Sequence, residues 1–173
     1  MLRANSLKRL TQKRTIRPLY AWHQATPYAA FLDAAVSTST LIYPGQVASK
    51  STGEQMVVCD NSKVPFGLFA NFINGAMDEL GGGTEIGVWR GGPDATFEIL
   101  AGPSSTETPL APGVDWVSKN ATAGGVALFS NANGRLAATG DTGDGAVSTI
   151  RVARLVEAVS NAKIIVTLDI QVS

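Results

Sequence analysis

Short apolar segments follow one another from residue 37 to the end of the chain, and glycine, proline or polar residues separate them. The clearest segment is 164–172, where aliphatic residues occupy every second position from Ile164 to Val172. Successive side chains of a β-strand point to opposite faces, so this spacing predicts a strand with one apolar face. Phe97 and Ile99 alternate with the polar residues Thr96 and Glu98 and predict a second strand with one face turned inward.

Many short strands with few helices predict an all-β fold, a small β-barrel or β-sandwich with at most one short helix. A short helix over 155–160 is the alternative for part of the strand predicted at 149–159. Two segments, 44–50 and 112–119, both begin with Pro-Gly and end with Ser-Lys. They are either an internal duplication or two ordinary hairpins. The segments predicted as strands are 41–43, 47–50, 55–59, 66–73, 85–90, 96–100, 114–118, 126–129, 149–159 and 164–172.

The charge of the chain is distributed unevenly, although the formal net charge is zero. Residues 1–17 hold six of the fourteen basic residues and no acid, a charge of +6. The other eight basic residues stand against all fourteen acids, which leaves −6 on residues 18–173. Blocks of like charge at a terminus are typical of interaction tails. We therefore predict a basic N-terminal arm that binds a partner through Arg3, Lys8, Arg9, Lys13, Arg14 and Arg17, with the aromatic residues Tyr20 and Trp22.

An arm of this length and charge is predicted to be extended and to become ordered only on its partner. A short amphipathic helix that ends at Pro18 and a mitochondrial-type presequence are the alternatives. An acidic protein surface is favoured as the partner over nucleic acid. The reason is that residues 1–17 offer no aromatic side chain for base stacking and the acidic remainder would repel a polyanion. The apolar link at 19–36 is expected to lie on a surface, either of its own domain or of a neighbour. The predicted organisation is thus an arm and link, 1–36, followed by a β domain, 37–173.

Composition and candidate chemistry both point away from an enzyme. Only 16% of the residues are charged, against about a quarter in a typical soluble domain, which suits a subunit packed against neighbours. His23 is the only histidine and lies in the apolar link, while the only cysteine, Cys59, lies in an apolar run that predicts a buried thiol. Asp141 and Asp144 fall short of the ligand count of a calcium site. We predict no catalytic residue, no cofactor, no metal and no membrane partner.

Three features of the pattern occur together over residues 40–173. They are Pro44–Val47 before a hairpin that contains Gly53, the step Val64–Leu68, and the ending formed by Ile150–Ala158 and Ile164–Leu168. In this the chain resembles the capsid decoration proteins of tailed bacteriophages, also called head-stabilising or cement proteins. It departs from that family at Ala153, where a glycine is usual.

The resemblance implies a β-tulip-like domain with a structural role on the capsid surface of a virion. Such a protein would bind the outside of the phage head and stabilise contacts between major capsid subunits, with its arm reaching across a neighbouring subunit. The implied partners are the major capsid protein and copies of the chain itself, with a trimer favoured. The alternatives are another virion structural module, of the tail, baseplate or minor capsid proteins, and a nucleic-acid-binding protein that acts through the arm.

Overall fold

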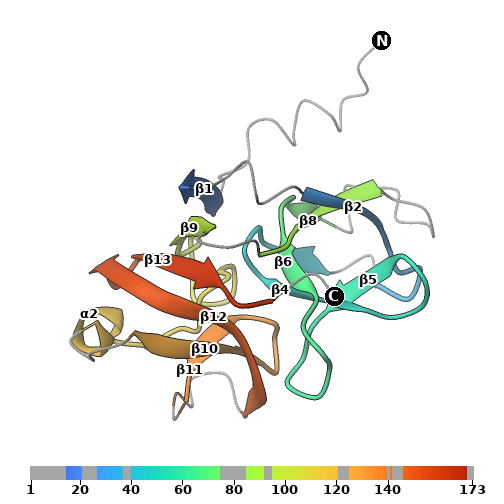
Figure 1. Ribbon diagram of the computed structural model, residues 1–173. Helices are drawn as coiled ribbons and strands as arrows, with labels where there is room; N and C mark the ends of the chain where they lie inside the picture. The colour runs from blue at the N-terminus through green and yellow to red at the C-terminus, as the bar shows by residue number, and fades with distance from the viewer. Residues whose placement is uncertain are drawn as a thin grey trace.

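The computed structural model describes residues 15–20, 27–36, 40–74, 85–91, 95–120, 125–139, 141 and 146–170. Their strands form a six-stranded antiparallel sheet, a closed five-stranded barrel and a small two-stranded sheet. The six-stranded sheet and the barrel lie side by side (Figure 1). The predicted all-β fold is confirmed, and the described residues contain one short helix.

The six-stranded sheet is built from both ends of the chain. Its first strand, β1, pairs with β9 in the middle of the sequence, and β9 pairs with the last strand, β13. Ile164, Val166 and Leu168 of β13 are buried, as their alternation predicts, and so are Phe97 and Ile99 of β9. In their order across the sheet, the strands are β1 (Ile16–Tyr20), β9 (Thr96–Leu100), β13 (Lys163–Leu168), β12 (Val147–Ser160), β10 (Val126–Asn131) and β11 (Leu136–Ala138).

The barrel closes through a strand that comes from the predicted link. Residues 27–32 form β2, which pairs with β8 on one side and with β5 on the other. Ala30 and Leu32 of this strand are buried in the barrel core, while Pro27, Ala29 and Phe31 are exposed, so this part of the apolar link forms part of the wall of the chain's own barrel. The barrel strands are β2 (Pro27–Leu32), β5 (Gln55–Val58), β4 (Val47–Lys50), β6 (Gly67–Phe69) and β8 (Glu85–Trp89), and β3 (Leu41–Ile42) pairs with β7 (Ile73–Asn74) beside them.

One wall of the barrel packs against the six-stranded sheet. Alternate residues of β4 and β6 belong to two different cores: Ala48 and Phe69 point into the barrel, while Val47 and Leu68 join the core of the sheet. Val47, Ala48 and Ser49 of β4 and all three residues of β6 are buried, so this wall is covered on both of its faces. The barrel and the six-stranded sheet, which we call the two halves, share one apolar interface.

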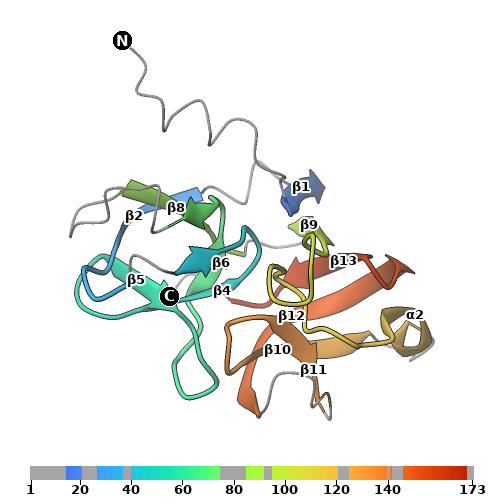
Figure 2. The ribbon, with the colours of Figure 1, turned by 180° about the vertical axis from the view of Figure 1, so that it is seen from behind.

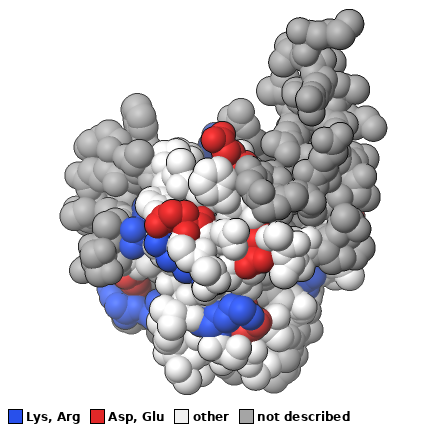
Figure 3. All heavy atoms as spheres, turned by 90° about the vertical axis from the view of Figure 1, so that its right-hand side faces the viewer, with Lys and Arg blue, Asp and Glu red and all other residues white. Residues whose placement is uncertain are grey.

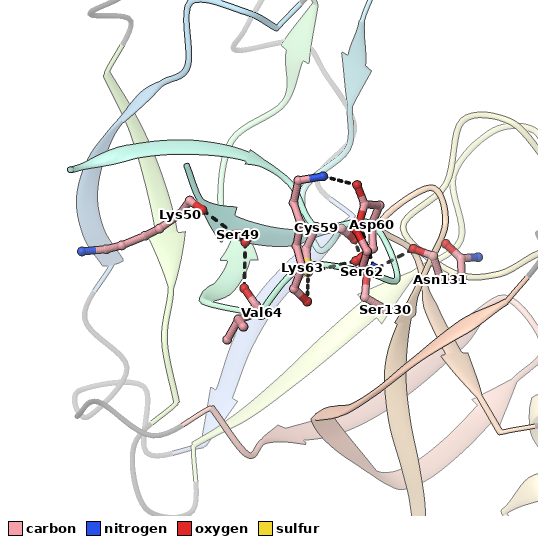
Figure 4. A network of polar contacts seen from close by, with 9 residues as sticks. All are labelled: Ser49, Lys50, Cys59, Asp60, Ser62, Lys63, Val64, Ser130 and Asn131. Atoms are coloured by element: carbon pink, nitrogen blue, oxygen red, sulfur yellow. Dashed lines mark hydrogen bonds and ion pairs between the residues drawn. The ribbon is translucent and has the colours of Figure 1, made fainter. Parts of the chain in front are cut away.

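A hairpin turn of the sheet locks this interface. The turn between β10 and β11 carries Gly134, whose carbonyl accepts a 2.7 Å hydrogen bond from the amide of Val47. In the same turn, the carbonyl of Asn133 accepts a 3.0 Å bond from the side-chain amide of Gln46. The hydroxyl of Ser130, on β10, donates to the carbonyl of Cys59 (Figure 4). Polar groups buried between the halves are thus paired across the junction.

Cys59 lies at the centre of the network drawn in Figure 4 and is fully buried, as its apolar surroundings predict. Its Sγ lies 3.5 Å from the carbonyl of Asp60 and 3.6 Å from that of Lys63. Burial raises the pKa of the thiol to about 11, so the side chain is neutral at physiological pH. A neutral, enclosed thiol is a packing residue.

The predicted strand at 114–118 is wrong, because this segment forms the short helix α2 (Trp116–Lys119). The carboxylate of Asp115 accepts a hydrogen bond from the amide of Ser118 and so caps the helix. The two Pro-Gly segments consequently differ in structure, since 44–50 leads into β4 and 112–119 into α2. The alternative of a helix at 155–160 is also wrong, because β12 continues to Ser160. Seen from behind, α2 lies at the end of the sheet that is remote from the barrel (Figure 2).

Candidate functional site

The root of the basic arm is fixed to the six-stranded sheet. Thr15 and Ile16 are buried, and the amide of Leu100 donates a 2.8 Å hydrogen bond to the carbonyl of Thr15. The hydroxyl of Thr15 donates to the carbonyl of Pro44, next to β4. Residues 15–20 are therefore ordered on the chain's own sheet, in contrast to the expectation for the arm as a whole. The apolar side chain of Ile16 supplies the physical reason, since it joins the core of the sheet.

Strand β1 forms one edge of the sheet, and Pro18 suits this position. The carbonyl of Thr15 faces β9, and orientation alternates along a strand, so the backbone nitrogen of Pro18 faces away from β9. Proline has no N–H and is tolerated in a sheet where none is needed. At this edge it also removes a donor that a further strand would use.

A buried glutamate holds β1 in place, and we call Glu98 with Arg17 and Lys163 the Glu98 clamp. Arg17 contacts the carboxylate with both ends of its guanidinium group, at 2.9 Å from Nε to Oε1 and 3.1 Å from Nη2 to Oε2. Lys163 Nζ lies 3.1 Å from Oε2. The clamp thus joins β1, β9 and β13 on the sheet face opposite to Phe97 and Ile99. Two-point contact of this kind fixes orientation as well as charge.

The ionisation of Glu98 depends on these partners. Burial alone would raise the pKa of the carboxyl group, but hydrogen bonds from Lys163 and Arg17 and their positive charges outweigh it, so the pKa is lowered. The side chain of Glu98 is therefore a negatively charged carboxylate at neutral pH. Sequence reasoning missed this residue, although a lone acid between Phe97 and Ile99 in a buried strand signals a partner.

Of the predicted docking residues, the structure describes the side chain of Arg17 and the backbone of Tyr20. Arg17 is exposed along most of its length, and Tyr20 ends β1 opposite Thr96. The other predicted docking residues lie outside the described residues; they are Arg3, Lys8, Arg9, Lys13, Arg14 and Trp22. His23 and Asp144 also lie outside the described residues. Their role in docking stays a prediction.

Comparison with known proteins assigns the chain to a family. Residues 2–172 match the family model of the phage cement proteins. This chain belongs to the phage cement protein family. No curated protein and no solved structure matches it. The match extends over the basic arm as well as the two β halves.

Membership of the cement family makes this a structural protein of the phage capsid, and the family is not an enzymatic one. No three of the His, Cys, Asp and Glu side chains of the described residues are grouped so as to hold a metal ion. The carboxylate of Asp141, one of the two aspartates considered for a calcium site, lies 2.8 Å from Lys119 Nζ and accepts a 2.7 Å hydrogen bond from the amide of Ala138. Within the described part of the chain, no helix is long and apolar enough to cross a membrane.

The described surface of the cement protein mixes charges of both signs. In the view onto the barrel side, basic and acidic side chains lie next to each other in small groups (Figure 3). Among the described residues, Lys63 pairs with Asp60 and Arg151 pairs with Asp169. Such pairs cancel locally, so the six cations of residues 1–17 remain the largest block of one sign in the sequence.

Replacing Glu98 by glutamine is expected to lower the free energy of unfolding at pH 7 by about 1–2 kcal/mol, because two cations lose their charged partner while staying partly in water. The lowered pKa gives the sign of the pH dependence. The contribution of the clamp is complete above the unfolded pKa of about 4.3 and is lost as the pH falls through the folded value. Urea unfolding of both proteins should therefore show a gap at pH 7 that narrows towards pH 3.

Glu157→Gln is the matched control, since Glu157 is exposed on β12. It should change stability little at either pH. A gap between wild type and Glu98→Gln that stays constant from pH 7 to pH 3 would contradict the clamp as described.

Proposed function

We propose that the chain binds the outside of the phage head and stabilises contacts between major capsid subunits, with its basic arm laid on a neighbouring subunit. The single observation that carries this proposal is the root of the arm. Thr15, Ile16 and Arg17 are held on the sheet, while five of the six cations of residues 1–17 precede them. Membership of the cement family supplies the capsid as the context.

The clamp gives the arm a mechanical role in this proposal. An arm that gains order on a subunit extends the contact beyond the footprint of the β halves. Load on such an arm passes through Arg17 to Glu98 and from there to β9 and β13, which lie inside the sheet. The joined cores of sheet and barrel then carry the load as one body. A chain whose β halves bind one capsid subunit and whose arm binds a neighbouring subunit resists separation of the two subunits.

Charge complementarity supports an acidic protein surface as the target of the arm. The body of the chain carries a formal charge of −6 beyond residue 17, which opposes approach to a polyanion. Opposite charges on arm and capsid would also speed association at low salt. The trimer expected from the family resemblance stays a prediction.

Removal of residues 1–14 is expected to weaken binding to expanded heads that lack the cement protein by roughly a hundredfold, because a second, linked contact is lost. The truncated chain begins at Thr15 and therefore keeps β1 and the Glu98 clamp. Binding of both proteins is measured by co-sedimentation with expanded heads over a range of protein concentrations, at low and at moderate salt.

A full-length variant with Arg3, Lys8, Arg9, Lys13 and Arg14 changed to glutamine is the control for arm length. It should bind nearly as weakly as the truncated chain and should lose most of the salt dependence. Equal binding of truncated and full-length chains would overturn the docking role of the arm. Retention on DNA without binding to heads would favour the nucleic-acid alternative.

A further inference from the structure

Two cations lie on a pair of aromatic rings at one end of the barrel. The rings of Tyr28 and Phe66 meet edge to face, with their centroids 5.2 Å apart. Arg90 Cζ lies 4.1 Å from the centroid of Phe66, and Lys50 Nζ lies 4.8 Å from it. Both cations also lie close to the ring of Tyr28, at 5.9 and 5.5 Å. We call these four residues the cation–aromatic cluster.

The topology of the barrel brings these residues to the same end. Tyr28 is near the start of β2, and Arg90 directly follows β8, which runs antiparallel to β2. Phe66 directly precedes β6, and Lys50 ends β4, which is antiparallel to β6. The two rings are partly buried and pack against the barrel core, so the cluster borders this core.

The cluster has more positive charge than its own acids neutralise. Lys50 Nζ lies 3.4 Å from Glu54 Oε1, and both side chains are largely exposed, so this pair is weak. Among the described residues Arg90 makes no ion pair, and its buried Nε has no hydrogen-bond partner. Contact with an aromatic face orients a guanidinium group but leaves its N–H donors free.

The neighbouring surface has the character of a contact site. Val64 is 68% exposed, the highest value for any large apolar residue in the described part of the chain. Its carbonyl accepts a 2.7 Å hydrogen bond from the hydroxyl of Ser49. Lys50 directly follows Ser49 and Phe66 comes two residues after Val64, so Val64 lies near the cluster. Arginine and aromatic residues beside apolar surface are enriched among the residues that dominate binding energy at interfaces.

We propose that the cation–aromatic cluster binds an aspartate or glutamate side chain on the outer surface of the head, with the carboxylate on the guanidinium group of Arg90. This inference rests on the proposed function and adds to it a second contact, on the barrel, apart from the arm. Arg90 is oriented by Phe66 before binding, so little side-chain freedom is lost in the complex. No carboxylate of the described residues lies on this guanidinium group, so a carboxylate of the partner supplies its counter-charge.

Arg90→Gln is expected to weaken binding of the full-length chain to expanded heads at least about tenfold, the cost of removing one partner of an interfacial charge pair. Arg90→Lys keeps the charge but loses the two-point contact, and it should lie between wild type and Arg90→Gln. Arg154→Gln, the same change on exposed β12, should bind within about twofold of wild type. Circular dichroism melting of each variant checks that the fold is retained, and Arg90→Lys serves as the test if Arg90→Gln is unstable.

The outcomes separate this inference from the proposed function. Wild-type affinity in Arg90→Gln and Arg90→Lys, with loss on removal of residues 1–14, would overturn the cluster contact and leave the arm intact. Failure of the wild-type chain to bind heads would overturn both. Loss of DNA retention in Arg90→Gln, with unchanged binding to heads, would show that the cluster binds phosphate and would also overturn the inference.

Discussion

Replacement of Trp116 by alanine is expected to lower the free energy of unfolding by about 3–5 kcal/mol, the range for deletion of a large buried aromatic side chain. Trp116 is 1% exposed and lies in the core of the six-stranded sheet, although it belongs to a helix of only four residues. A helix this short has little stability of its own. The indole ring therefore holds α2 on the sheet, and its loss leaves both a cavity and an unanchored segment.

The measurement for Trp116→Ala is thermal unfolding followed by circular dichroism. For a chain of this size the expected loss corresponds to a fall in Tm of roughly 6–20 °C. Val117→Ala is the matched control, because Val117 is the next residue and is 50% exposed; it should change stability by less than about 0.5 kcal/mol. Equal Tm values for the two variants would show that α2 does not depend on the indole ring.

The sequence pattern predicts the fold well wherever alternation and turns agree. The strand β13 and its buried residues Ile164, Val166 and Leu168 follow from period two alone, although the strand ends at Leu168 and does not continue to Val172 as predicted. The turn at Pro44-Gly45 is also found, with φ of 98° at Gly45, a conformation that glycine adopts without strain. In these places local preference and tertiary packing favour the same structure.

The pattern misleads where the strand ladder is irregular. Leu155 and Ala158 are both buried, three residues apart, which is the spacing of a helix face. The register between β12 and β13 shifts at Val156 and again at Val159, so each of these residues is an extra one in the ladder and is exposed. Two bulges thus convert the period of a strand into an apparent helical one.

The α2 error has a different cause. The alternation of Val114 and Trp116 favours a strand, but Asp115 with Ser118 three residues later is the pattern of a helix cap. Local capping and burial of Trp116 in the sheet core determine the outcome together. The capping signal is present in the sequence, but the alternating apolar pattern around it favours a strand more strongly.

The candidate site could be predicted only in its local part. A block of like charge is visible in any sequence, whereas the Glu98 clamp joins residues 81 positions apart through the pairing of β1 with β9. The cation–aromatic cluster likewise draws one residue from each of four barrel segments. Non-local register of this kind is fixed by the closed barrel and the sheet order, which no single segment specifies.

The arrangement of the two halves bears on how a cement protein resists load. Val47 and Leu68 extend the sheet core into the barrel wall, so the halves cannot separate without exposing apolar surface. The arm root lies on the sheet and the cation–aromatic cluster on the barrel. In the proposed function, load on the contact site of one half passes to the other half through this interface. The rigidity of the interface sets how firmly the two contact sites are held relative to each other.

The hairpin turn at Gly134 tests this interface directly. Gly134→Ala is expected to lower the free energy of unfolding by about 2–4 kcal/mol, from roughly 1 kcal/mol of left-handed backbone strain and 1–3 kcal/mol of overpacking. Its φ is 71°, and a Cβ atom there would lie 2.3 Å from Val58 Cγ1 in the barrel. Displacement of the turn also strains the hydrogen bond from the amide of Val47 to the carbonyl of Gly134.

Gly53→Ala separates the two causes of this loss, because Gly53 has φ of 57° but a methyl group on its Cα would meet nothing within 4 Å. It should cost only about 1 kcal/mol, the strain alone. Urea unfolding of both variants, with binding to expanded heads measured beside it, gives the comparison. If Gly134→Ala unfolds at the same urea concentration as Gly53→Ala, the barrel and the turn are not in close contact, and the transmission of load across this interface loses its structural basis.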